Sequence, residues 1–144
     1  MTVPPALVDV ALLVGRVLLG VLFFAHGWQK LFTNGIKGTA AFFDQSGVPA
    51  PTASAWVAGV LELVGGALLV LGLVVPVAAL LLVLDMLGAY LFVHAGNGLF
   101  IDQGGFELVG ALGAGCLLLL ALGGGRYSVD HQVFGRRASP ARAR

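Results

Sequence analysis

Four long runs of apolar residues constrain the fold more than any other feature of this sequence. They cover about residues 8–26, 53–74, 76–93 and 106–122. A helix needs about 20 mostly apolar residues to cross the hydrocarbon core of a bilayer, and each run is close to that length. The runs do not alternate between polar and apolar residues, which favours helices over the strands of a membrane barrel. The sequence therefore predicts an all-α integral membrane protein with a four-helix bundle.

The composition supports a membrane protein. Of the 144 residues, 58% are hydrophobic and 10% are charged, whereas a soluble protein has about 45–50% apolar and about 25% charged residues. The net charge of +1 gives no reason to expect a nucleic-acid partner. The first run lacks a basic start and an Ala-x-Ala exit, so we interpret it as a retained helix and not as a cleaved signal peptide. The single cysteine, Cys116, leaves no pair for dithiol exchange by this chain alone.

The distribution of basic residues predicts the orientation in the membrane. Five arginines follow residue 122, whereas the segments after the first and third runs contain only Lys30 and Lys37. Cytoplasmic segments of membrane proteins are enriched in Lys and Arg, so both termini are expected in the cytoplasm. We expect residues 1–131 to form a single transmembrane domain and residues 132–144 to form a basic, disordered cytoplasmic tail.

The segments between the runs differ in length. Residues 72–76 run from a glycine to a proline and leave room only for a tight antiparallel turn, so the second and third helices should be neighbours. The segment 32–51 has two interpretations: a short interfacial helix with Phe42 and Phe43 in lipid, or a solvated loop. Small residues four apart would allow close helix packing, and they occur at Ala55/Gly59, Gly110/Ala114 and Ala111/Gly115.

Three ionisable residues lie near the middle of three different runs: Arg16, Glu62 and Asp85. A charge at that depth costs at least about 2.5–3.5 kcal/mol, so we expect the three side chains to face one another. Two carboxylates beside one arginine could share a proton, which suits a proton relay or a site for a polar head group. The alternative is that the three residues only hold the helices together.

A second polar group is expected toward the outer surface: His26, Lys30, His94 and Glu107. Helical spacing puts Lys30 almost above Arg16, where it could pair with Glu107 and form a polar path to the central cluster. For both histidines an interfacial hydrogen bond is favoured over a proton relay, a haem site or another metal site. The sequence assigns no catalytic residue. It contains no nucleotide-binding or phosphate-binding motif, so redox work would need a partner or a diffusing lipid-soluble cofactor such as a quinone.

Several motifs resemble those of the DoxX family of membrane proteins. The first is Gly15-Arg16-Val17-Leu18-Leu19-Gly20, followed by His26-Gly27-Trp28-Gln29-Lys30-Leu31-Phe32. The others are Gly59-Val60-Leu61-Glu62-Leu63-Val64-Gly65-Gly66 and the closing segment Gly123-Gly124-Gly125-Arg126-Tyr127-Ser128-Val129-Asp130. The resemblance covers about residues 10–131. By position, Arg16, Lys30, Glu62 and the segment 126–128 match the family pattern.

The resemblance implies a four-helix protein of the inner, or plasma, membrane. The family is named after a subunit associated with terminal quinol oxidase and thiosulfate:quinone oxidation, and some relatives are described as membrane parts of oxidoreductase complexes that defend against oxidative stress. The leading hypothesis is thus an accessory subunit of a quinone-linked redox complex, with the bilayer and oxidoreductase subunits as partners. Whether the chain is itself an enzyme stays open. The alternatives are a non-enzymatic anchor or scaffold that docks soluble partners through the basic tail, and a transporter of small amphiphiles that would need to form a homo-oligomer.

Overall fold

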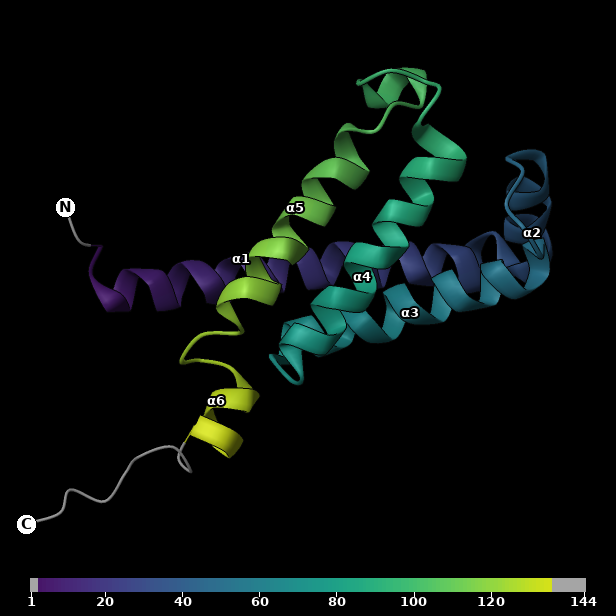
Figure 1. Ribbon diagram of the computed structural model, residues 1–144. Coiled ribbons are helices and arrows are strands. Elements are labelled where there is room, and N and C mark those ends of the chain that lie inside the picture. The colour runs from purple at the N-terminus through teal and green to yellow at the C-terminus, as the bar shows by residue number, and fades with distance from the viewer. Residues whose placement is uncertain (1–2, 136–144) are drawn as a thin grey trace, which may run out of the picture.

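The structure of the protein is a computed structural model that describes residues 3–135. Within these residues every regular element is a helix (Figure 1). The longer helices are α1 (Pro5–Trp28), α2 (Gly35–Gln45), α3 (Pro51–Leu71), α4 (Val75–Ala89) and α5 (Glu107–Leu122). The short elements are η1 (Gln29–Thr33), η2 (Tyr90–His94), η3 (Ile101–Gln103) and α6 (Val129–Phe134).

All four predicted apolar helices are present, and three of them reach the length of a membrane crossing. These three are the continuous segments Pro5–Thr33, Pro51–Leu71 and Val75–His94. Helix α5 is apolar but has 16 residues, which gives about 24 Å at a rise of about 1.5 Å per residue. That length is less than the hydrocarbon thickness of about 30 Å. The three long helices make the chain a multi-pass membrane protein.

The first crossing is longer than the predicted 8–26, whereas the third agrees with the predicted 76–93 to one residue at each end. Both crossings end in a π-helical turn. Helix α1 passes into η1, and α4 passes into η2. A π-helical turn adds a residue to the turn and shifts the side chains that follow, and such turns are frequent at functional sites. Lys30 and His94, two of the predicted site residues, lie in these two π-helical turns.

The main helices form two pairs. Helices α1 and α3 lie side by side along most of their length, and α4 and α5 form a second pair that crosses the first at a steep angle (Figure 1). The predicted tight turn between the second and third apolar helices is confirmed, since α3 ends at Leu71 and α4 begins at Val75. The buried apolar side chains of α4 and α5, with Phe23 and Leu69, form one core.

Close packing between α1 and α3 depends on four glycines, which we call the glycine seam: Gly20 and Gly27 of α1, and Gly59 and Gly66 of α3. A Cβ atom added at Gly27 would lie 2.3 Å from the backbone nitrogen of Leu63, and one added at Gly20 would lie 2.6 Å from the carbonyl oxygen of Gly66. Helices in lipid associate by such close backbone approach. Of the predicted small-residue pairs, Ala55/Gly59 lies in this contact, whereas at Gly110 a Cβ would approach only Phe106 of its own helix.

The segment 32–51 contains a helix, as the first of its two interpretations predicted. Helix α2 lies at the Lys30 end of the α1–α3 pair (Figure 1). Phe42 is 51% exposed, whereas Phe43 is half-buried. The predicted boundary between residues 131 and 132 falls inside helix α6. The arginines of the predicted tail, at positions 136, 137, 142 and 144, lie outside the described residues.

Candidate functional site

Arg16 binds the end of α3 and not the two acids. Its guanidinium donates to the carbonyl oxygens of Leu69 (2.9 Å), Val70 and Tyr127 (2.9 Å), and the residue is 2% exposed. The last carbonyl groups of a helix have no partner within the helix, and the helix dipole makes that end negative. The prediction that Arg16 faces Glu62 and Asp85 is therefore wrong. Glu62 lies about 10 Å away along α3, seven residues before Leu69.

The closing segment completes this contact. Asp130 accepts hydrogen bonds from the backbone nitrogens of Val74 (2.7 Å) and Val75 (2.8 Å), which are at the start of α4, and its own backbone nitrogen donates to Gly72 (3.0 Å). A carboxylate at this position satisfies free N–H groups and interacts favourably with the positive end of the helix dipole. Ser128 caps α6 by accepting from the backbone nitrogen of His131. The closing segment thus stabilises the turn between α3 and α4 through these hydrogen bonds.

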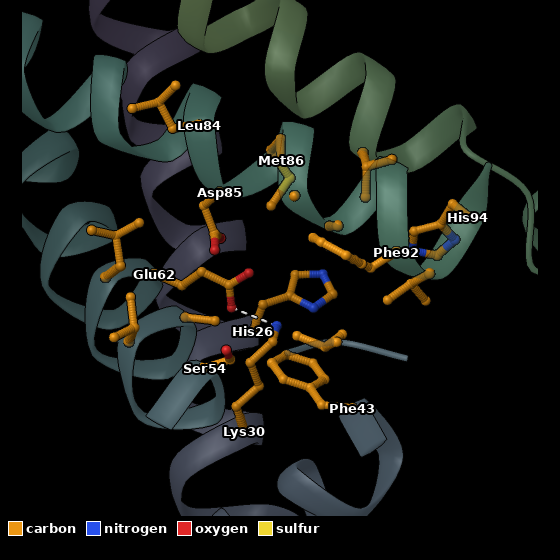
Figure 2. Close-up of a pocket in the computed structure, with 18 of the residues that line it drawn as sticks. His26, Lys30, Phe43, Ser54, Glu62, Leu84, Asp85, Met86, Phe92 and His94 are labelled. Atoms are coloured by element: carbon orange, nitrogen blue, oxygen red, sulfur yellow. Dashed lines mark hydrogen bonds and ion pairs between the residues drawn. The ribbon is translucent and has the colours of Figure 1, made fainter. Parts of the chain in front are cut away.

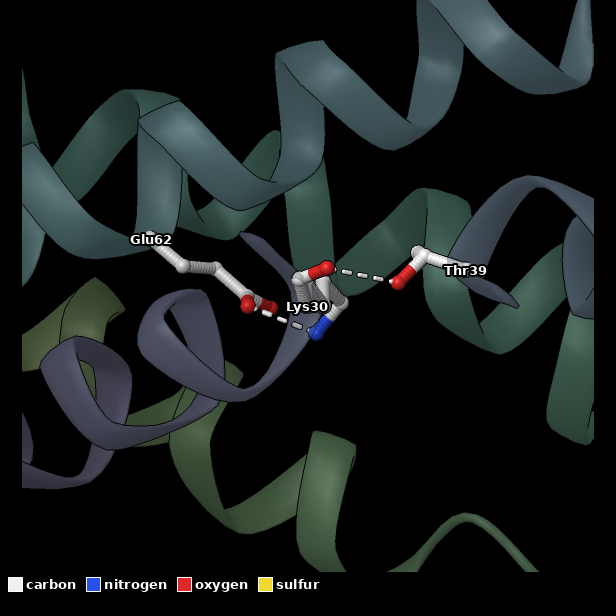
Figure 3. Close-up of polar contacts among 3 residues, drawn as sticks. All are labelled: Lys30, Thr39 and Glu62. Atoms are coloured by element: carbon white, nitrogen blue, oxygen red, sulfur yellow. Dashed lines mark hydrogen bonds and ion pairs between the residues drawn. The ribbon is translucent and has the colours of Figure 1, made fainter. Parts of the chain in front are cut away.

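Lys30 forms the one ion pair among the described residues. Its Nζ lies 2.6 Å from Oε2 of Glu62, and the Glu62 side chain is only 4% exposed. Thr39 of α2 donates from its hydroxyl to the carbonyl oxygen of Lys30 at 2.8 Å (Figure 3). The contacts join η1 to α3 on one side and to α2 on the other. Lys30 is consequently held in place at the junction of three elements.

The predicted pair between Lys30 and Glu107 is wrong. Glu107 accepts instead from the backbone nitrogen of Ile101 at 2.8 Å, within the loop that precedes its own helix. His94 is hydrogen-bonded through Nδ1 to the carbonyl oxygen of Gly104 at 2.6 Å. Both side chains stabilise the connection between α4 and α5. Glu107 is the partner of a backbone N–H there, and His94 is the partner of a backbone carbonyl oxygen; both groups need a hydrogen bond when they are not in a helix.

A cavity of about 690 Å³ lies between the two helix pairs, beside the ion pair. The Asp85 carboxylate points toward Glu62 from α4 (Figure 2). Its Oδ2 atom is buried and has no hydrogen-bond partner among the described residues. Buried polar atoms are nearly always hydrogen-bonded in native structures. The unpartnered oxygen of Asp85 therefore marks a place where a further polar group fits.

Five of the seven predicted site residues line this cavity, and two do not. The five come from α1, η1, α3, α4 and η2: His26, Lys30, Glu62, Asp85 and His94. Arg16 and Glu107 lie outside it. The sequence pattern thus identified most of the polar lining but divided it incorrectly between a central and an outer cluster. In the structure Lys30 replaces Arg16 as the cation that faces the acids.

The sequence analysis did not find the aromatic side of the cavity. Phe42 and Phe43 of α2 and Phe92 of η2 line it, and Figure 2 shows Phe43 beside Lys30. The signal in the sequence was the spacing of Thr39, Phe42 and Phe43, which puts a polar anchor and an aromatic ring on the same face of α2.

The lining is mostly apolar, with one cation and two acids close together. Sites for small molecules usually combine such an apolar wall with a few polar groups that fix orientation. The arrangement can accept a hydrogen bond through the carboxylates and donate one through the ammonium group. Among residues 3–135, no group of three or more His, Cys, Asp or Glu side chains is arranged to hold a metal ion.

Comparison with known proteins finds relatives that match most of this chain. A protein of Bacillus subtilis named "Putative oxidoreductase CatD" is 32% identical over 127 residues, which cover 88% of this chain and 89% of that protein. An uncharacterized membrane protein of Mycobacterium tuberculosis is 34% identical over 98% of this chain and 88% of its own length. "Inner membrane protein YqjF" of Escherichia coli is 32% identical over 85% of this chain and 91% of its length. No solved structure matches the chain.

The family comparison agrees with these relatives. The family model described as DoxX matches residues 11–95, a range that contains the glycine seam and the polar residues of the cavity from His26 to His94. The apolar helices and the relatives together make the chain a multi-pass protein of the inner membrane. This chain belongs to the DoxX family.

Proposed function

We propose that the chain is an accessory membrane subunit of a quinone-linked oxidoreductase complex, and that the cavity beside Lys30, Glu62 and Asp85 binds the quinone head group. The observation that carries this proposal is the buried, unpartnered Oδ2 of Asp85 beside an ion pair in a mostly apolar cavity. A lipid-soluble ring with polar substituents matches both parts of such a site.

Different polar residues would contact different substituents of the head group. Lys30 can donate a hydrogen bond to a ring carbonyl, while Asp85 can accept one from a ring hydroxyl. Glu62 and Asp85 face each other at the middle of their helices, where two neighbouring carboxylates tend to share one proton. The quinone, when bound, supplies the electron chemistry. The residues of this chain bind the head group, orient it between Lys30 and Asp85, and hold a proton beside it.

The comparison with the relative named "Putative oxidoreductase CatD" supports the redox assignment. The lack of a nucleotide or flavin motif in the sequence supports an accessory role. Electrons would thus come from a partner subunit. The scaffold alternative depends on the tail at 136–144, which lies outside the described residues, so no structural observation favours it.

The proposal also includes a topology. Four crossings, with α5 as a short fourth one in a locally thinned bilayer, place both termini in the cytoplasm by the distribution of arginines. In this topology the cavity lies nearer the outer surface of the membrane. The exposed apolar faces of the helices could also form the contacts of a homo-oligomer. Labelling of single cysteines introduced at position 37 and position 126, in a Cys116→Ala background, tests the orientation. Position 37 should react from outside and position 126 only after the membrane is opened.

Quinone titration of the purified protein in lipid nanodiscs tests the binding site. We expect Asp85→Asn to weaken the binding of the reduced form, a benzoquinol, at least several-fold, because the amide keeps the size of the side chain but loses the charged acceptor for a ring hydroxyl. Asp44→Asn is the matched control, since Asp44 is exposed on α2 and does not line the cavity. Equal affinities in the wild type and both variants would contradict the proposal.

A further inference from the structure

A second cavity adjoins the first and lies on the membrane-facing surface between α3 and α4. It has a volume of about 500 Å³, and the residues that line it carry no charged side chain. The cavities share three lining residues: Val57, Leu61 and Leu81. Because these residues line both cavities, the apolar groove lies directly beside the polar cavity.

The groove runs away from the ion pair toward the α3–α4 turn. Its lining on α3 extends from Trp56 to Leu68, and the part beyond the shared Leu61 is about 10 Å long at the helical rise of about 1.5 Å per residue. On α4 it reaches back from Leu81 to Val77. The polar cavity and the groove together thus have the shape of a head-group site with an apolar extension.

We infer that this groove holds the first part of an isoprenoid tail whose head group lies beside Lys30 and Asp85. The inference rests on the proposed function and adds to it that the ligand is a prenylated quinone and not a short, tailless one. A phospholipid does not suit the same pair of cavities, because its anionic phosphate would lie beside the carboxylates of Glu62 and Asp85, and Lys30 is already paired with Glu62.

The contact between the isoprenoid tail and the groove depends on how well their shapes match. Lipid chains are as apolar as the groove, so the hydrophobic effect gives the tail little preference for it. The head group therefore fixes the ligand, and the groove determines where the tail lies. The inference accordingly predicts the position of the tail and makes no claim of a large gain in affinity.

Photo-crosslinking tests this position. The probe is a benzoquinone with a short prenyl tail that ends in a diazirine, added to the full-length protein in nanodiscs and mapped by mass spectrometry of the labelled peptides. We expect saturable labelling of residues 64–78, which an excess of the same quinone without the diazirine prevents. Val64→Trp should reduce this labelling several-fold, because the indole fills the groove from an exposed position.

Leu18→Trp is the matched control, because Leu18 is 60% exposed on α1 and lines neither cavity. That substitution should leave the labelling unchanged. Saturable labelling spread evenly over the exposed faces of α1, α3 and α5 would overturn the inference and leave the head-group site intact. The absence of any saturable labelling in the wild type would contradict both the inference and the proposed function.

Discussion

The buried Arg16 and the half-buried Lys30 have partners of different kinds. Arg16 binds three backbone carbonyl oxygens, whereas Lys30 binds one carboxylate. The difference follows from their chemistry. The planar guanidinium group has five N–H donors that can reach several carbonyls, while the ammonium group is a compact charge. Arg16 therefore stabilises the fold, and Lys30 contributes its charge to the cavity.

Arg16→Lys tests this division of roles. A lysine cannot reach all three carbonyl oxygens from the same position, so we expect the variant to lose about 1.5–3 kcal/mol of unfolding free energy, the usual contribution of a hydrogen bond to a charged group. Chemical unfolding in detergent, followed by tryptophan fluorescence, measures the loss. The quinone affinity of the folded protein should not change, because Arg16 does not line the cavity.

An outcome in which Arg16→Lys keeps full stability but loses quinone binding would contradict this assignment. It would instead return Arg16 to the ligand site, where the sequence alone suggested it.

The sequence could give the depth of each buried charge but not the direction in which it points. It correctly placed Glu62 and Asp85 together, because both lie near the middle of their helices. It paired them with the wrong cation for two reasons. The carbonyl groups at the end of α3 are acceptors that leave no mark in the sequence. Lys30 also lies in a π-helical turn, Gln29–Thr33, which the sequence did not predict.

At the scale of the elements, the seam between α1 and α3 determines where Arg16 and Lys30 meet α3. Gly20 and Gly27 are seven residues apart on α1, and Gly59 and Gly66 have the same spacing on α3. Because seven residues are close to two helical turns, each pair lies on one face of its helix. This spacing is visible in the sequence, so the contact could have been predicted from these pairs.

Gly27→Ala tests the seam. The added methyl group would meet the backbone of Leu63 and Gly59 at 2.3 and 2.8 Å, and backbone cannot move aside as a side chain can. Overpacking of this kind typically costs about 1–3 kcal/mol. We expect a corresponding fall in unfolding free energy and weaker quinone binding, since the shift separates Lys30 from Glu62.

Gly15→Ala is the control in the same helix, because a Cβ there meets nothing within 4 Å. Alanine has a better helix propensity than glycine, so this variant should be as stable as the wild type or slightly more stable. Equal losses at positions 15 and 27 would contradict the role of the close contact, because of these two positions a Cβ meets the backbone of α3 only at position 27.

At the scale of the whole molecule, the site exists because two helix pairs cross. The turn η1, which continues α1, and helix α3 supply the ion pair, and α4 supplies Asp85 from the other pair (Figure 2). The sequence predicted the helices and the tight turn between α3 and α4, since both depend on local patterns. The crossing of the pairs depends on long-range packing and on the closing segment at the α3–α4 turn, which a single sequence does not specify.

Native mass spectrometry of the protein extracted gently from its membrane tests the central claim most directly. The wild type should carry a bound prenylated quinone, identified by its mass, and the Asp44→Asn control should carry the same amount. Asp85→Asn should retain several-fold less. A wild type that carries only phospholipid, or a quinone whose occupancy is the same in Asp85→Asn, would contradict the account.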